Sequence, residues 1–269
     1  MRSRRPARRS WLLVGLGVVA CAAAALAAYL ALTRETAQPA SVSQAVEQLR
    51  ALPAAARELP PALRGRAPTP GVYRYTTGGS EVSHVLGTRR HAYPARTTVA
   101  VSTTAAGCLR TRWDVLATRF DAVLACRRPD GSWRLVSQSD EHEFAGHIDR
   151  RTYVCTPDST YRPARLAPGT SWRSHCSIDG TTTADRSTVL GPRTFTLDGR
   201  RTRTVLLRTR THVSGDTIGT GTTDTWILPR TGLIVRRAID NASRTETIVG
   251  DVAYEEQATL ALSSPRPLR

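Results

Sequence analysis

The longest hydrophobic stretch of the chain runs from Trp11 to Leu32 and contains no charged residue. Its length matches the ~20 apolar residues that a helix needs to cross a bilayer. Arginines that precede such a segment favour the cytoplasmic side of the membrane. We therefore predict a basic cytoplasmic tail over 1–10, a transmembrane helix over 11–32 and an extracytoplasmic location for the remainder. The tail carries five arginines: Arg2, Arg4, Arg5, Arg8 and Arg9.

Two other interpretations of this stretch stay open. A cleaved signal peptide fits the small-x-small triplet Ala25-Leu26-Ala27 and the arginine pair Arg8-Arg9. A lipoprotein signal fits the run that ends at Cys21, which would then carry the lipid. Ala22 to Leu32 stays apolar where a lipidated cysteine is usually followed by a polar tether, so we favour a retained helix with Cys21 buried inside it.

Residues 33–70 are predicted to form a stalk helix and a proline-rich linker. Ser41 to about Leu59 reads as the helix, with Ser41 and Gln44 as a capping box and Pro53 as a limit or kink. Five apolar residues fall on one stripe of that helix: Val42, Ala45, Val46, Leu49 and Leu52. Four prolines then mark a stiff linker: Pro60, Pro61, Pro68 and Pro70.

From Gly71 onward the pattern changes to short alternating runs of Thr, Val and Arg, which indicates strands. Asp-Gly pairs at 130–131, 179–180 and 198–199 supply the positive φ of hairpin turns. Ser214-Gly215-Asp216 and Pro229 to Gly232 are two further turns. The expected strands are 71–76, 81–87, 96–103, 107–115, 119–127, 133–138, 142–147, 151–156, 171–178, 182–190, 193–197, 201–213, 219–228, 232–239, 243–249 and 252–262.

Short connections between these strands predict a mainly β, antiparallel meander over 71–262, followed by a tail over 263–269. The long run 201–213 places Val205, Leu207 and Val213 on one face and basic residues on the other. One buried and one wet face is what an antiparallel sheet permits. So much sheet must close on itself or cover its inner face, and we expect a curved sheet or half-barrel.

Four cysteines lie beyond the predicted membrane segment: Cys108, Cys126, Cys155 and Cys176. An even number in an oxidising compartment indicates disulfides. Folding 107–115 against 119–127 as a hairpin sets Cys108 opposite Cys126, so we predict that pair together with Cys155–Cys176. No C-x-x-C occurs, which disfavours a zinc site; no metal ligand is assigned.

The net charge of +16 comes entirely from arginine, because the chain contains no lysine. This excludes phosphate-loop lysines, Schiff-base lysines and Ser-Lys dyads. Codon bias explains arginine in place of lysine, whereas attraction to an anionic envelope polymer or lipid is the functional alternative. The arginines are spread along strands and no nucleic-acid-binding motif occurs, so nucleic acid is not an expected partner.

The densest ionisable run is Asp140-Glu141-His142-Glu143, followed by His147. The two histidines are five residues apart, which is one too many for H-E-x-x-H and places them on opposite sides of a strand. We expect this run to be a solvated strand edge or turn. No G-x-S-x-G is present. We predict no catalytic residue and no cofactor, although a triad assembled in space is not excluded by sequence.

One block, from Gly199 to about Arg237, resembles a known family. It holds the run Trp226 to Arg236, with the pattern Trp-x-x-x-x-x-Gly-Leu-x-x-Arg across a hairpin. This is similar to the sheet of the LolA/LppX/RseB-like superfamily of envelope proteins. That resemblance implies a curved half-barrel that carries lipids or lipoproteins, or senses envelope components, without catalysis.

The sequence therefore favours a membrane-anchored, extracytoplasmic module that binds an apolar or amphipathic envelope ligand, such as lipid or lipoprotein. The alternative is a structural or protein-interaction subunit of an envelope complex that uses its arginine-rich strand faces. A hydrolase is the third hypothesis. Six residues are candidates for lining the ligand, with ordinary sheet core as the competing interpretation: Val205, Leu207, Trp226, Leu228, Leu233 and Val235.

Overall fold

The structure is a computed structural model that describes residues 38–84, 87–144, 147–247 and 250–269. The predicted cytoplasmic tail, the membrane helix over 11–32 and Cys21 lie outside the described residues. Within the described ranges, no helix is both long and apolar enough to cross a membrane.

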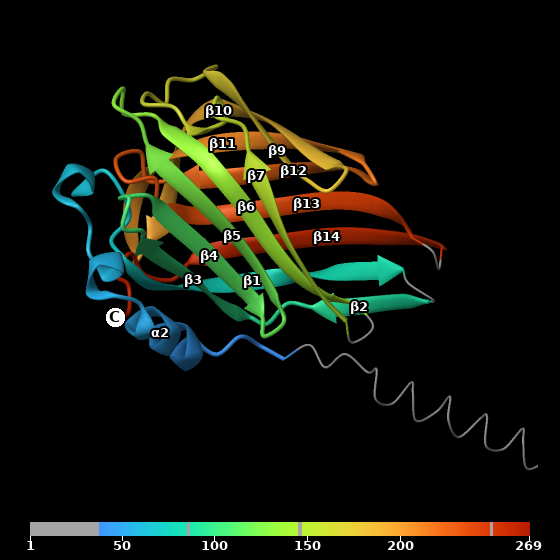
Figure 1. Ribbon diagram of the computed structural model, residues 1–269. Coiled ribbons are helices and arrows are strands. Elements are labelled where there is room, and N and C mark those ends of the chain that lie inside the picture. Colours follow the sequence, from blue (N-terminus) through green and yellow to red (C-terminus); the bar gives the residue numbers. More distant parts are fainter. Residues whose placement is uncertain (1–37, 85–86, 145–146, 248–249) are drawn as a thin grey trace, which may run out of the picture. The chain divides into compact units, whose positions relative to one another are not determined.

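The described residues after the helical segment form fourteen strands, all paired antiparallel in the registers observed (Figure 1). The strands are β1 (Gly71–His84), β2 (Thr88–Ala92), β3 (Arg96–Thr103), β4 (Leu109–Leu116), β5 (Arg119–Arg127), β6 (Trp133–Phe144), β7 (His147–Cys155), β8 (Thr160–Arg162), β9 (Ser171–Ile178), β10 (Thr181–Leu197), β11 (Arg200–Gly215), β12 (Thr217–Ile227), β13 (Ile234–Thr247) and β14 (Gly250–Leu262).

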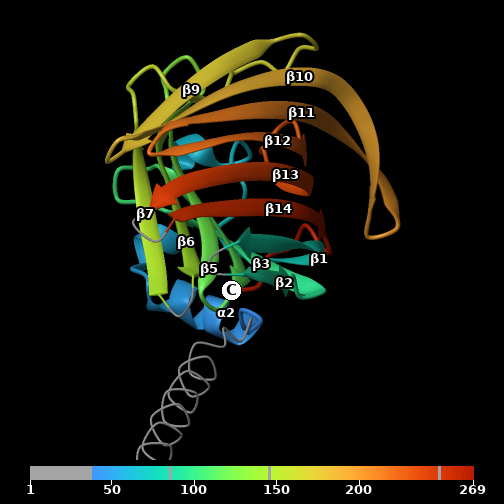
Figure 2. The same ribbon diagram turned by 90° about the vertical axis from the view of Figure 1, so that its right-hand side faces the viewer.

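Twelve of these strands form a closed ring. Neighbours follow the order β14-β13-β12-β11-β10-β9-β7-β6-β5-β4-β3-β1, and β1 pairs again with β14 (Figure 2). The sheet thus closes further than the predicted curved sheet or half-barrel. Closure depends on β1, which pairs with β3 along 71–76 and with β14 along 75–84. Strands so far apart in sequence leave no local pattern that reveals their pairing.

Four pairs of predicted strands are single long strands, β1, β6, β10 and β13, and the short strands β2 and β8 were not predicted. The predicted strands 71–76 and 81–87 join as β1, which ends at His84, through Gly79, whose φ is +119° and whose Cα lies against the backbone of Gln257. A side chain at Gly79 would overlap that backbone, so glycine lets the strand continue there. Residues 182–190 and 193–197 join as β10 across a bulge between Val189 and Gly191.

The predicted helix is shorter than 41–59. Helix α2 spans Val42–Ala51, and the Ser41 hydroxyl accepts a hydrogen bond from the Gln44 backbone N–H at its start. Pro53 follows its end, and the short 3-10 turns η1 (Ala54–Arg57) and η2 (Pro61–Leu63) replace the remainder. Ala45 and Leu49 pack on Val72 of β1, so the helix is part of the β domain's packing.

Both predicted disulfides are confirmed, Cys108–Cys126 and Cys155–Cys176. The second joins the position where β7 and β9 meet. These two strands share only two registered residue pairs among the described residues, Val154 with Ser177 and Cys155 with Cys176. The ring is therefore splayed at this seam and held there by a covalent bond.

Candidate functional site

A cavity of about 240 Å³ lies inside the ring and is partly open to solvent. This volume is just below the ~300–1,000 Å³ of typical small-molecule pockets. Inward-facing residues from nearly every strand of the ring line it, because side chains alternate between the two faces of a strand. The register keeps them in rows, so that Thr225 of β12 faces Leu207 of β11 on one side and Arg237 of β13 on the other.

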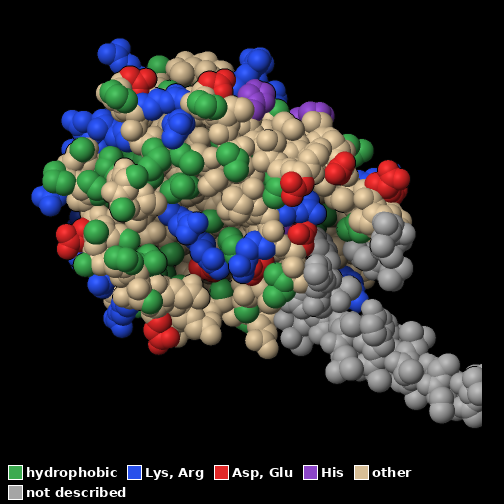
Figure 3. All heavy atoms as spheres, viewed as in Figure 1, with side chains coloured by type: hydrophobic (Ala, Val, Ile, Leu, Met, Phe, Trp, Pro, Cys, Tyr) green, Lys and Arg blue, Asp and Glu red, His purple; other side chains and the backbone are tan. Residues whose placement is uncertain are grey.

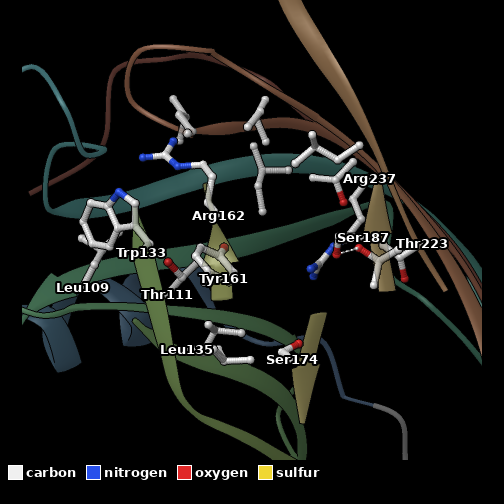
Figure 4. Close-up of a pocket in the computed structure, with 18 of the residues that line it drawn as sticks. Leu109, Thr111, Trp133, Leu135, Tyr161, Arg162, Ser174, Ser187, Thr223 and Arg237 are labelled. Carbon is white, nitrogen blue, oxygen red and sulfur yellow. Dashed lines mark hydrogen bonds between the residues drawn. The ribbon is translucent and has the colours of Figure 1, made fainter. Parts of the chain in front are cut away.

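One end of the cavity is apolar. Its walls there come from the main hydrophobic core and include Tyr75, Leu109, Trp133 and Leu233. The guanidinium of Arg162 lies 5.6 Å from the Trp133 ring centre (Figure 4). Aliphatic and aromatic walls of this kind favour an apolar part of a ligand.

The other part of the lining is rich in hydroxyl groups: Thr111, Ser174, Ser187, Thr209, Thr211, Thr223 and Thr225. Ser187 and Thr209 share a hydrogen bond of 2.8 Å. Asp185 is the one carboxylate among the described lining residues. It accepts hydrogen bonds from Thr211, Ser174 and Gln138 at 2.6, 3.3 and 3.3 Å. Its oxygens are therefore satisfied by neutral donors.

Two arginines line the cavity without a carboxylate partner among the described residues, Arg162 and Arg237. Arg162 donates to the carbonyl of Arg66 at 3.4 Å, and burial lowers the pKa of its guanidinium. Arg237 extends from β13 toward Ser187 (Figure 4), and its Nε atom is buried with no hydrogen-bond partner in the described part of the chain. With Asp185, the charged lining amounts to two cations against one anion.

A second cluster of polar residues lies inside the ring but does not line this cavity. We call it the carboxylate–arginine network: Glu81, Tyr93, Arg119, Asp121, Asn241, Tyr254 and Glu256. Arg119, only 3% exposed, lies 2.7 Å from Asp121, 3.4 Å from Glu81 and 3.6 Å from Glu256.

Hydrogen bonds complete this network. Tyr254 donates to Glu81 at 3.0 Å, while Tyr93 and Asn241 donate to Glu256 at 2.7 and 3.3 Å. Burial alone would raise the pKa of Glu81, but the hydrogen bond with His91 and the charge of Arg119 outweigh it and lower that pKa to about 2. Burial raises the pKa of Glu256. These buried charges compensate one another internally.

Asp140 and His142 of β6 flank this network. Burial, with the charge of Asp121, raises the pKa of Asp140 to about 7. Burial, with the positive charge of Arg119, lowers the pKa of His142 to about 3. Glu141 is 6% exposed and accepts a hydrogen bond from Arg150. The expectation of a solvated strand edge is therefore wrong at these three positions, because the closed ring covers the face to which Asp140 and His142 point.

The six predicted lining residues lie in different surroundings. Leu207 and Leu233 line the cavity. Val205 packs in a small core cluster with Val189 and Ile227, and Val235 is fully buried in the main core. The other two, Trp226 and Leu228, are partly buried against the main core, and the Arg236 guanidinium lies over the Trp226 ring.

Sequence reasoning missed Asp185, Arg237 and the inward threonines. On 201–213 the alternation of threonine with arginine was visible, but it did not indicate which polar side chains face a cavity. Thr209 and Thr211 lie on the same face of 201–213 as Val205 and Leu207, but a threonine on the inner wall of a closed sheet has no local pattern that distinguishes a cavity from packed core.

Comparison with known proteins adds little to this geometry. No protein family and no curated protein matches the chain. Among solved structures, the crystal structure of the hypothetical lipoprotein YmcC from Escherichia coli K12 aligns with a TM-score of 0.31 and 13% identity, over 83% of this chain and 90% of that one. This is a weak structural relation, and membership of the LolA/LppX/RseB-like superfamily stays a prediction.

Proposed function

We propose that this chain is a membrane-anchored, extracytoplasmic module that binds an apolar or amphipathic envelope ligand, without catalysing a reaction on it. The observation that carries the proposal is the cavity, with its apolar end at Trp133 and its hydroxyl-rich wall. A ring filled by its own side chains would have no room for a ligand. The LolA-like resemblance of the Trp226 to Arg236 block agrees with this function.

The first test is native mass spectrometry of the full chain purified from an oxidising host, with lipid extraction in parallel. We expect a co-purifying amphiphile and a mass lower by four hydrogens, which corresponds to two disulfides. An apo mass together with an empty extract, repeated after incubation with envelope lipids, would contradict the proposal.

A cavity-filling variant makes this test specific. Thr223→Trp places an indole in the cavity, whereas Thr222→Trp places the same side chain on the outer face of β12. We expect the first to abolish ligand retention and the second to retain it. Equal retention by the two variants would show that the ligand binds elsewhere.

The second candidate function is binding of an anionic envelope polymer, and one observation on the outer face favours it. Arg173, Arg186 and Arg210 lie directly opposite one another on β9, β10 and β11, and all three are exposed. In Figure 3, arginine and histidine side chains lie together where β9 and β10 are found in Figure 1. Like charges directly opposite each other destabilise a sheet, and an anionic partner relieves that repulsion.

Polyphosphate binding tests this second function. Replacing Arg173, Arg186 and Arg210 with Gln should weaken binding and flatten its dependence on salt, because fewer counterions are exchanged. The matched control replaces three exposed arginines from other parts of the domain, Arg74, Arg110 and Arg230. An equal loss in the control would assign the binding to net charge alone.

A further inference from the structure

We propose that the ligand of the cavity is an anionic amphiphile whose carboxylate or phosphate group binds Arg237 while its hydrocarbon part lies toward Trp133. This inference rests on the proposed function and adds the charge and orientation of the ligand. It starts from the contrast between the cavity and the rest of the interior, where buried charges have partners.

Arg237 is placed by strand register. Its neighbours across the strands are Thr225 on β12 and Leu260 on β14, so it projects into the ring between a hydroxyl group and the apolar core. Its Nε is buried and lacks a hydrogen-bond partner in the described residues. A buried donor that is left unsatisfied is costly, and an ionised acceptor supplies the strongest compensation.

Within the part of the chain that the structure describes, the cavity lining offers Arg237 no such acceptor. The carboxylate of Asp185 is already engaged by Thr211, Ser174 and Gln138, and no ion pair of Arg237 occurs among the described residues. Arg162 adds a second positive charge to the lining, held between the Trp133 ring and Gly232. An excess of one positive charge in a site of low polarity selects an anion over a neutral or cationic ligand.

The surroundings of Arg237 suit an oxyanion. Ser187, Thr223 and Thr225 line the same part of the cavity, and Figure 4 shows Ser187 and Thr223 near Arg237. Hydroxyl donors and a guanidinium together match the several lone pairs of a carboxylate or phosphate. From there the lining changes toward Tyr75, Leu109 and Trp133. A ligand with one charged end and one hydrocarbon chain satisfies both parts.

The test uses 10-bromodecanoate and its methyl ester, which share a chain and differ in charge. Bromine quenches tryptophan fluorescence on contact, and Trp133 and Trp172 line the cavity. The full chain is placed in phosphatidylcholine nanodiscs with Trp11→Phe in every variant, so that quenching reports on the β domain. Comparing variants in identical discs cancels partition of the probe into lipid.

We expect the acid to bind roughly tenfold more tightly than the ester, and Arg237→Gln to remove this preference while ester binding stays unchanged. Arg74→Gln, an exposed arginine next to the cavity residue Tyr75, should keep the preference. Equal binding of acid and ester to the unmodified chain, or a preference that survives Arg237→Gln, would overturn the inference and leave the proposed function intact.

Two further outcomes are decisive. Quenching by neither compound would contradict the proposed function as well. Inorganic phosphate that displaces the acid at the same concentration as decyl phosphate would show that the site takes a free anion, and that the hydrocarbon chain contributes nothing. Displacement by decyl phosphate at a far lower concentration is the result we expect.

Discussion

The interior of the ring contains two polar regions that were built in opposite ways. In the carboxylate–arginine network, Arg119 lies within 4 Å of three carboxylates, and tyrosine and amide donors satisfy the remaining oxygens. In the cavity, Arg237 has no carboxylate partner among the described residues. The Nε atoms of both arginines are buried without a hydrogen-bond partner in the described part of the chain, so the two regions differ in their ion pairs. Buried charges that compensate each other have a structural role. A buried charge without a counter-charge indicates a binding site for an oppositely charged ligand.

The largest effect should come from the network. Arg119→Met leaves Glu81 and Glu256 buried without their cation, and we expect a loss of about 3–5 kcal/mol in the free energy of unfolding. Urea denaturation followed by circular dichroism measures it. Should the methionine variant fail to fold, Arg119→Lys keeps the charge and should recover part of the loss. A loss below ~1 kcal/mol for Arg119→Met would mean that the network contributes little.

The next largest loss of stability should come from removing a disulfide. The loops closed by Cys155–Cys176 and Cys108–Cys126 span 21 and 18 residues, so replacing either pair with serine should cost about 3 kcal/mol. Their local effects should differ. Hydrogen exchange along Trp172–Ser174, which lines the cavity, should speed up without Cys155–Cys176, because two registered residue pairs are all that join β7 to β9 in the described residues. Unchanged exchange there would contradict the role assigned to this seam.

The pH dependence of stability distinguishes two titratable side chains beside the network, His142 and Asp140. Because the pKa of His142 is lowered to about 3 in the folded protein, the ring stays neutral down to that pH, whereas the unfolded chain protonates it below its ordinary pKa of 6.5. Stability therefore falls as pH drops through this window. Asp140 acts in the opposite direction, since its pKa is raised to about 7 in the folded state and stability falls as pH rises from about 4 to 7.

These two contributions oppose each other and cancel in part in the unmodified protein between pH 4.5 and 6.5. Asp140→Asn should lose about 2 kcal/mol between pH 6.5 and 5, and His142→Gln should gain about as much. Denaturation series at three pH values check the slopes. Equal slopes in the two variants would contradict the assignments.

The smallest effect on stability belongs to the cavity. Arg237→Met removes a charge that has no carboxylate partner in the described ranges, so the free energy of unfolding should change by ~1 kcal/mol or less, in either direction. The same variant should lose the preference for the anionic probe. A destabilisation as large as that of Arg119→Met would place Arg237 with the structural charges and remove the contrast between the two regions.

Much of the secondary structure could be predicted from sequence. The Asp-Gly turns end strands where expected, as between β9 and β10, where Asp179 has a positive φ. Hairpin geometry alone paired Cys108 with Cys126. The start of helix α2 at its Ser41 cap could also be predicted from the sequence. The helix ends before Pro53, earlier than the apolar stripe suggested.

By itself, the sequence determined much of what is local: most strand positions, the hairpin turns, the helix cap and both disulfides, since these depend on residues near one another in the chain or on a single fold of it. Tertiary structure decided what depends on distant partners. Pairing of β1 with β14 closes the ring, and closure turns one face of each strand into an interior. That step makes Arg119 a buried structural charge and Arg237 a cavity charge, although each is an arginine in a similar alternating strand.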